Sequence, residues 1–351
     1  MDQISNEMVG WSGADNAQVK DHSPRGTVYT IGAFVKVFKT SFPKGMSDGP
    51  KVGFISVVFT NMGGVETWHK SLIPSLRQQI DIRGFVSIND PHKSIKDLEV
   101  DWGAGEEDAR QLIRKIDTLV LWGDDNPRRF FTEMTPKRVI CLHHGDETSV
   151  WSHRTILRQR KFATDVVAVN PVVAEKYGYT NIPNAVSNNR ISSLFAPDSK
   201  TVLWGHRLSA EKRPELAVKI AKIMPDFKFI FAGDGALSDW LRDNLPKNSI
   251  YVGGFSNLVP YLEQSSVFLA TPDQEGFGYS VLEAICSGVP VVSSHTGIAK
   301  EMADQTVSDE NLFSWAKAIR ACSGSVAKNK DLAKELYSHE RFIDRWSNFL
   351  R

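Results

Sequence analysis

Short apolar runs alternate with amphipathic stretches along most of the chain, and this alternation indicates mixed α/β structure. The first run, KVGFISVVF from Lys51, has the length of a buried strand, and GGVETWHKSLIPSL behind it predicts a glycine turn that opens a helix. Further strands are expected at residues 84–88, 118–122, 138–143 and 165–169. Amphipathic stretches separate them, so the predicted sheet is parallel with helices on both faces.

The alternation begins again after a polar, turn-rich segment at residues 179–199. The second series of strands is expected at residues 200–205, 227–233, 249–254, 267–271 and 290–294. Two doubly wound domains facing across a cleft are therefore predicted, with residues 179–199 as the linker. The tail from about residue 309 is expected to be helical, and its last stretch, ERFIDRWSNFL, has an aromatic spacing suited to docking on a neighbouring element.

The first 50 residues do not follow this pattern. Residues 1–26 carry few apolar side chains and predict a loose leader or irregular arm. Residues 27–40 are rich in β-branched and aromatic side chains and predict a strand or hairpin, and residues 41–50 form a turn-rich break. An edge strand packed on the first domain is the simplest interpretation of 27–40.

Size and composition agree with two globular domains. A chain of 351 residues is longer than one hydrophobic core comfortably supports. With 41% hydrophobic and 24% charged residues, it has the composition of an ordinary soluble protein. No apolar run approaches the roughly 20 residues needed to span a bilayer, and the polar start lacks the blocks of a signal peptide. A cytoplasmic protein is expected, with peripheral attachment at the membrane as an alternative.

The number of cysteines and the net charge argue against a disulfide-rich protein, a zinc protein and a protein with a general attraction to nucleic acid. Cys141, Cys286 and Cys322 are too few and too scattered for a disulfide framework or a zinc site. A formal net charge of +1 gives no general attraction to nucleic acid, and a local patch of basic residues is the alternative. No Asp-x-Asp motif placed for a divalent metal is evident, and GDDNP at residues 123–127 is interpreted as a loop.

Candidate chemistry lies where strands end, because ligands bind at the carboxyl ends of parallel strands. GHRLSAEKRPE at residues 205–215 places Arg207 and Lys212 between a strand and a helix, where two cations suit a diphosphate. Two solvated surface cations are an equally good interpretation of the charges alone. Likewise ICLHHGDE ends a strand with His143 and His144, of which at most one faces a given site. Such a pair is more often structural than catalytic.

Two glycine turns follow strands in a similar way. FAGDG holds Gly233, Asp234 and Gly235, and MGG holds Gly63 and Gly64. Glycines permit a tight turn and close ligand approach, although a plain strand-to-helix turn explains each motif as well. Because the third glycine of a dinucleotide fingerprint and the Gly-Lys-Ser/Thr of a phosphate-binding loop are both absent, a nicotinamide dehydrogenase and an NTPase are disfavoured.

The most informative stretch is EGFGYSVLE, which runs from Glu275 to Glu283. Its glycines allow a sharp turn into a helix whose first amides can hold an anionic group. Glu275 stands beside them as an acceptor for hydroxyls. Glu283 lies among apolar neighbours and needs partners, because burying a bare carboxylate is costly. Sugar or ribose hydroxyls would serve, and a structural salt bridge is the alternative.

EGFGYSVLEAICSGVPVV resembles the signature of retaining GT-B glycosyltransferases, specifically of glycosyltransferase family four. NMGGVETW, NIPNAV, GHRLSAEKRPELA and FAGDG follow the order of that family's other motifs, so the similarity covers roughly residues 51–305. Two departures concern the family's glycines, with Ala185 in the linker motif and Thr296 in the sugar-contacting loop. The first 50 residues have no obvious counterpart.

The resemblance implies an α/β protein of the GT-B class, with two Rossmann-like domains and C-terminal helices docking back on the N-terminal domain. Residues 1–50 would be an extension, 51–185 the acceptor-side domain, 186–330 the nucleotide-sugar-binding domain and 331–351 the docking helix. On this view the strand at 27–40 could help to shape the acceptor side, through Phe34 and Phe38.

The resemblance also assigns roles to residues. Arg207 and Lys212 would bind the diphosphate, Glu275 would contact the donor sugar, Glu283 would bind the ribose, and His143 or His144 would lie near the reacting sugar. The other donor-binding residues would be Gly63, Gly64, Gly205, Gly233, Asp234, Gly235, Gly276, Phe277, Gly278, Tyr279 and Ser280. Cofactors and metals are not expected.

The implied function is transfer of a sugar, a hexose by expectation, from a UDP- or GDP-sugar with retention of configuration. The acceptor, the donor base and the choice between double displacement and same-face attack stay open. Two rivals remain, a nucleotide-sugar epimerase on the same fold and a non-catalytic module that binds nucleotide sugars.

Overall fold

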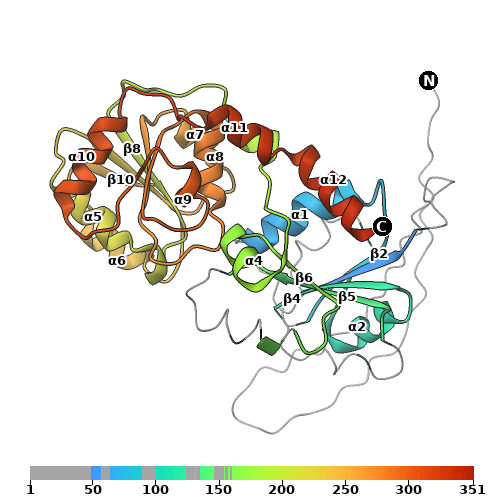
Figure 1. Ribbon diagram of the computed structural model, residues 1–351. Helices are drawn as coiled ribbons and strands as arrows, with labels where there is room; N and C mark the ends of the chain where they lie inside the picture. Colours follow the sequence, from blue (N-terminus) through green and yellow to red (C-terminus); the bar gives the residue numbers. More distant parts are fainter. Residues whose placement is uncertain are drawn as a thin grey trace, which may run out of the picture. The chain divides into compact units, whose positions relative to one another are not determined.

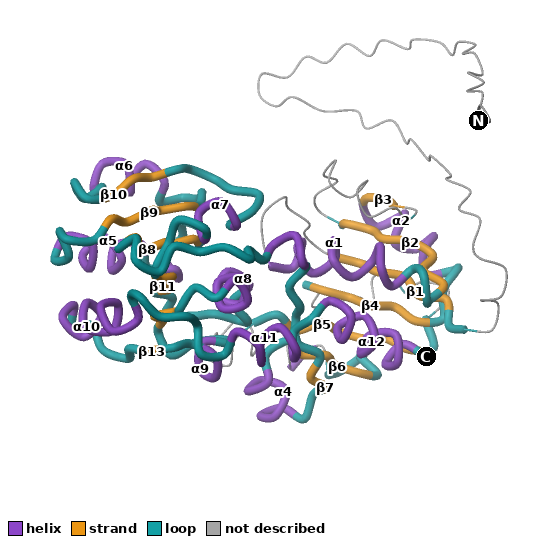
Figure 2. The backbone as a smooth tube through the Cα atoms, turned by 90° about the horizontal axis from the view of Figure 1, so that it is seen from above, coloured by secondary structure: helices purple, strands orange, loops and turns teal. Residues whose placement is uncertain are grey.

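A computed structural model describes residues 49–56, 64–88, 100, 102–123, 131, 135–145, 154, 157–158 and 160–351. The predicted strand or hairpin at 27–40, with Phe34 and Phe38, lies outside the described residues, as does Gly63. Within the described part, the predicted α/β architecture is confirmed as two parallel sheets, each with helices packed on both faces (Figures 1 and 2).

The first sheet has the strand order β3-β2-β1-β4-β5-β6-β7, and all its pairings are parallel. Its strands are β1 (Lys51–Ser56), β2 (Asp81–Ser87), β3 (Trp102–Ala104), β4 (Thr118–Trp122), β5 (Arg138–His143), β6 (Asp165–Ala168) and β7 (Thr180–Asn181). Its helices are α1 (Gly64–Leu76), α2 (Gly105–Ile113) and α4 (Pro171–Tyr177). The five longer strands match the predicted runs.

Strand β1 shows how this sheet becomes buried on both sides. Val52 and Phe54 belong to the apolar cluster that includes α1, whereas Ile55, on the opposite face of the strand, packs with α2. Successive side chains of a strand point to opposite faces, so a continuous apolar run is needed to fill both layers. This is why the strands of this protein read as unbroken apolar runs rather than as alternating ones.

The second sheet has the order β10-β9-β8-β11-β12-β13 and is also parallel. Its strands are β8 (Thr201–Gly205), β9 (Lys228–Ala232), β10 (Ser249–Tyr251), β11 (Val267–Ala270), β12 (Val291–Ser293) and β13 (Gln305–Thr306). Its helices are α5 (Pro214–Lys222), α6 (Ser238–Asn244), α7 (Val259–Leu262), α8 (Tyr279–Ser287), α9 (Ala299–Met302), α10 (Leu312–Cys322) and α11 (Lys330–Leu336). Helices α5 and α10 pack on one face and α7 and α8 on the other.

The last helix, α12 (His339–Leu350), packs on the first sheet's layer rather than on the second. Phe342 and Trp346 are buried there, and the Trp346 ring lies 5.2 Å from the Trp68 ring of α1, centroid to centroid. Figure 1 shows α12, in red, beside α1, in blue. The predicted docking of the tail is therefore confirmed.

The linker and the start of α12 run side by side. The Val186 amide donates to the Tyr337 carbonyl at 3.1 Å, and Val186 and Ser338 form a parallel bridge. The linker itself holds a single turn of 3₁₀ helix at Asn188–Arg190. Among the described helices, none is long and apolar enough to cross a membrane.

Candidate functional site

Two loops of the second sheet meet at the carboxyl ends of neighbouring strands. Strand β8 leads into the loop that carries Arg207 and Lys212, and β11 leads into the loop that carries Glu275. Because β8 and β11 are paired, the two loops leave the same edge of the sheet side by side. The strand order thus brings together the loop that carries the predicted cations and the loop that carries the first glutamate.

Lys212 and Glu275 form an ion pair. The Lys212 Nζ donates to Glu275 Oε2 at 2.7 Å, and the two side chains are only 13% and 17% exposed. Burial alone would raise the pKa of Glu275, but the Lys212 ammonium and the Phe277 amide outweigh it and hold that pKa below its usual value. The pair thus holds a carboxylate and an ammonium in direct contact at the carboxyl ends of β8 and β11.

Arg207 is placed differently from Lys212. Its side chain is 59% exposed and donates to Glu211 Oε1 at 2.9 Å on the same loop. Glu211 also accepts a hydrogen bond from the Ser209 hydroxyl at 2.6 Å. The two cations that the sequence groups together thus have separate carboxylate partners, and Arg207 would have to leave Glu211 to reach a diphosphate.

The turn before α8 depends on glycine at two points. Gly278 caps the helix with a φ of 102°, a conformation that side-chain-bearing residues rarely adopt. A Cβ built on Gly276 would lie 1.9 Å from the His144 carbonyl oxygen, so only glycine fits there. Phe277, between them, turns its ring into the core, 5.8 Å from the Tyr337 ring between centroids. Its amide rather than its ring faces the site.

His206 is a site residue that sequence reasoning missed. It is 5% exposed, its Nε2 lies 3.3 Å from the Leu269 carbonyl oxygen, and its Nδ1 lies 3.2 Å from the Ser280 hydroxyl in the first turn of α8. Burial and the nearby Lys212 charge lower the pKa of His206 to about 3, so the ring is neutral. A carbonyl can only accept, so Nε2 carries the proton and Nδ1 accepts from Ser280. The only signal in the sequence is its place between Gly205 and Arg207.

Glu283 is the most buried carboxylate of the site. It is 1% exposed, and its Oε1 accepts from the Nε of Arg190, which comes from the linker. Its Oε2 is buried and has no hydrogen-bond partner among the described residues. Burial raises the pKa of Glu283, and the Arg190 guanidinium opposes the shift. Tyr279, whose hydroxyl pKa is raised by burial and by Glu283, lies near the same carboxylate. The salt-bridge alternative is therefore present, but it occupies one oxygen only.

The second glycine turn, after β9, packs tightly against the loop that follows β8. A Cβ on Gly233 would lie 1.8 Å from the His206 carbonyl oxygen, and one on Gly235 would lie 2.4 Å from that of Leu208. Asp234 accepts from the Ser238 hydroxyl at 2.7 Å and so closes the turn into α6. Packing accounts for the two glycines and a turn-closing hydrogen bond for Asp234, and their role in donor binding stays a prediction. Gly205 is also a packing residue, because a Cβ there would meet the side chains of Leu258 and Phe268.

Replacing Gly233 with alanine is expected to destabilise the protein strongly. The new methyl group would overlap a backbone oxygen that cannot move without shifting the loop from His206 to Leu208. Gly254→Ala is the matched control, because its Cβ would make only an ordinary 3.5 Å contact with Asp234. Thermal unfolding of both variants tests the expectation, and equal melting temperatures would contradict it.

The two histidines at the end of β5 lie in an aromatic environment. His143 ends the strand and is buried, and the His144 ring meets the Trp68 ring edge-on at a centroid distance of 5.6 Å. Burial, with the neighbouring His69 and His143, lowers the pKa of His144 to about 3. Gly64 begins α1. Roles for these residues near a sugar stay predictions.

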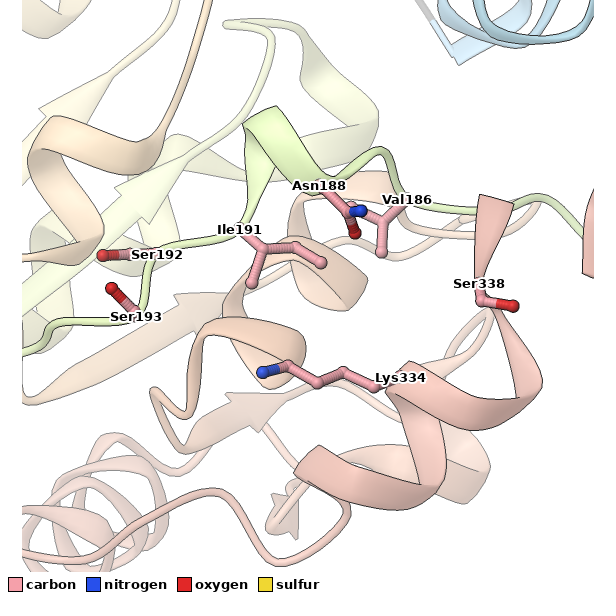
Figure 3. A pocket seen from close by; sticks show the side chains of 7 residues that line it. All are labelled: Val186, Asn188, Ile191, Ser192, Ser193, Lys334 and Ser338. Atoms are coloured by element: carbon pink, nitrogen blue, oxygen red, sulfur yellow. The ribbon is translucent and has the colours of Figure 1, made fainter. Parts of the chain in front are cut away.

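A small pocket of about 240 Å³ borders the linker. Figure 3 shows Val186, Asn188 and Ile191 of the linker on one side, and Lys334 of α11 and Ser338 on the other. Ser192 and Ser193 complete the lining. The pocket thus marks the segment that also supplies Arg190, the partner of Glu283.

Several known proteins that are similar to this chain are glycosyltransferases by name. Residues 186–330 match the family model of the group 1 glycosyl transferases. The chain is 25% identical over 211 residues to the GtfA subunit of a UDP-N-acetylglucosamine–peptide N-acetylglucosaminyltransferase from Streptococcus agalactiae, covering 49% of this chain and 41% of the relative. It is 27% identical over 150 residues to 2-deoxystreptamine N-acetyl-D-glucosaminyltransferase from Niallia circulans, covering 36% and 39%. The aligned parts thus span about two fifths of the curated relatives' length.

Among solved structures, the chain is similar to Anabaena Alr3699/HepE in complex with UDP and glucose. The TM-score is 0.72 at 14% sequence identity, over 86% of this chain and 99% of that one. This similarity shows that the fold is shared. The matched family model lies over the domain that holds Lys212, Glu275 and Glu283. Residues 186–330 thus match the group 1 glycosyl transferases, and the chain has the GT-B fold that its sequence motifs resemble.

Proposed function

We propose that this protein transfers a hexosyl group from a UDP-sugar to an acceptor, with retention of configuration. The observation that carries the proposal is the ion pair of Lys212 with Glu275 in the loop before α8, beside a buried carboxylate of that helix, Glu283. One oxygen of Glu283 has no hydrogen-bond partner among the described residues. A cation for phosphate, a carboxylate for sugar hydroxyls and a second carboxylate for ribose hydroxyls are the groups that such a donor requires.

The chemistry follows from charge. As the sugar leaves, negative charge grows on the diphosphate, and Lys212 together with the first amides of α8 would stabilise it in a largely desolvated place. Glu275 would then be released from the ammonium to accept hydrogen bonds from the sugar. Retention is supported by the motif resemblance, and UDP is supported by the names of the similar proteins. Those relatives are named for different acceptors, so no acceptor is assigned.

A panel of labelled nucleotide sugars tests the proposal without knowledge of the acceptor. The full chain is incubated with UDP-N-acetylglucosamine, UDP-glucose, UDP-galactose and their GDP counterparts. Slow release of free sugar with retained anomeric configuration, followed by NMR, is the expected result for a retaining transferase. An isomerised nucleotide sugar would indicate the epimerase instead, and an unchanged donor that still binds would indicate a binding module.

Donor hydrolysis is expected to survive EDTA. The proposed site neutralises the diphosphate with Lys212 and helix amides, so chelation should remove no group on which the rate depends. Within the described ranges, no group of three or more His, Cys, Asp or Glu side chains is placed to hold a metal ion. Loss of hydrolysis with EDTA and its restoration by Mg²⁺ or Mn²⁺ would contradict this expectation.

A further inference from the structure

We infer that Arg190 is a positioning residue for the nucleotide site: it holds Glu283 so that the second carboxylate oxygen accepts a hydrogen bond from a ribose hydroxyl. The inference rests on the proposed function, because it takes Glu283 as the ribose contact. It adds a residue from the linker, outside the loops and helix that carry the predicted site residues.

The two carboxylate oxygens of Glu283 differ in their hydrogen bonding. Oε1 accepts from the Nε of Arg190, whereas Oε2 is buried and has no hydrogen-bond partner among the described residues. A buried acceptor without a hydrogen-bond partner costs folding free energy. We therefore take this oxygen as the place where a ligand donates a hydrogen bond. A carboxylate oxygen only accepts, and the ribose hydroxyls of a nucleotide are neutral donors that suit it.

Arg190 is fixed independently of Glu283. Its Nη1 donates to the Ser256 carbonyl at 3.1 Å, and the preceding residue, Asn189, accepts through its carbonyl from the Asn257 side chain at 2.9 Å. Asn257 is itself tied to the start of α7, because its Oδ1 accepts from the Val259 amide at 3.0 Å. The guanidinium therefore stands in place before a ligand arrives and sets the rotation of the Glu283 carboxylate.

The charge of Arg190 matters as well as its place. Burial favours the protonated form of Glu283, and a protonated carboxyl group would be a weaker acceptor for a hydroxyl. The guanidinium counters this effect from 93 residues away in the chain. Without it, Glu283 would lose its fixed orientation, and its pKa would be raised further, although the residue itself is unchanged.

The test compares binding of UDP with binding of 2′,3′-dideoxy-UDP, which lacks both ribose hydroxyls, by calorimetry. In Arg190→Gln, UDP affinity is expected to fall about 10- to 100-fold, the range for a lost hydrogen bond to a charged group. The dideoxy analogue should bind the unaltered protein more weakly than UDP does. Its affinity should fall little further in Arg190→Gln. Arg320→Gln, which breaks the exposed pair between Arg320 and Asp226, is the control and should leave both affinities unchanged.

Two outcomes would overturn the role of Arg190: unchanged UDP affinity in Arg190→Gln, or equal losses for UDP and its dideoxy analogue. If Arg190→Gln fails to fold, Arg190→Lys is compared in the same way, since it keeps the charge but cannot hold Glu283 and Ser256 together. If the unaltered protein binds GDP instead, the GDP pair replaces the UDP pair. Binding of no nucleoside diphosphate at all would overturn the proposed function itself.

Discussion

Lys212→Ala is expected to lower the turnover number about 100- to 1,000-fold, the usual cost of losing one preorganised electrostatic contact to the transition state. The ammonium is the partly buried cation of the site, held 2.7 Å from Glu275, and would meet the departing diphosphate there. The expected signature is a fall in kcat, measured as donor hydrolysis or transfer under donor saturation.

Lys219→Ala is the matched control, because Lys219 is an exposed lysine of α5, the helix that follows the same loop. It should behave as the unaltered protein does. The melting temperature of Lys212→Ala must be measured too, since the change leaves Glu275 without its ammonium. A folded Lys212→Ala variant with near-normal turnover would remove the diphosphate assignment.

Arg207→Ala is expected to reduce turnover as well, for the same electrostatic reason. The structure adds a condition, because Arg207 is largely exposed and bound to Glu211. Its loss should therefore have little effect on folding, so a reduced rate can be attributed to contact with the donor. If Arg207→Ala turns over as fast as the unaltered protein, Arg207 does not contact the diphosphate, and Lys212 is the only one of the two cations still assigned to it.

Glu275→Gln and Glu283→Gln are expected to separate catalysis from binding. Glu275 is paired with the cation that would meet the diphosphate, so its amide variant should lose turnover, by about 100-fold, with a smaller change in donor affinity. Glu283 is buried and paired with Arg190 rather than with Lys212, so its amide variant should mainly weaken UDP binding, by about 10- to 100-fold.

Calorimetric titration with UDP and steady-state rates, measured on both variants, test the separation. Glutamine has nearly the shape of glutamate, so each variant is its partner's control for packing. If neither affinity nor turnover changes in either variant, the donor site lies elsewhere in the protein.

Strand prediction from the sequence succeeds where burial on both faces forces a run of about five apolar residues. Runs such as TLVLW and TVLWG correspond to β4 and β8 almost to the residue. The strands that the sequence analysis misses are β3, β7 and β13, which have three, two and two residues. They lie at sheet edges, where a strand needs little apolar surface and leaves little pattern.

The sequence predicts candidate site residues but not which of them pair. Lys212 and Glu275 stand out because each follows a strand, yet their ion pair joins positions 63 residues apart and depends on β8 lying beside β11. Arg190 lies in a segment whose polar composition indicates only a linker. His206 is not predicted either, because a single histidine in a loop gives no sign in the sequence that its side chain will be buried.

The position of α12 has a consequence for biosynthesis. Phe342, Ile343, Trp346 and Leu350 complete the apolar layer over β1, β2 and α1, although the whole second sheet lies between them and that layer in chain order. A nascent chain therefore exposes Trp68 and its neighbours until α12 has been made. The first sheet and its helices are therefore synthesised first but finish folding last, whereas the second sheet and its helices can fold before α12 is made. Ribosome-stalled chains ending before residue 339 should accordingly be sensitive to protease in the first part alone.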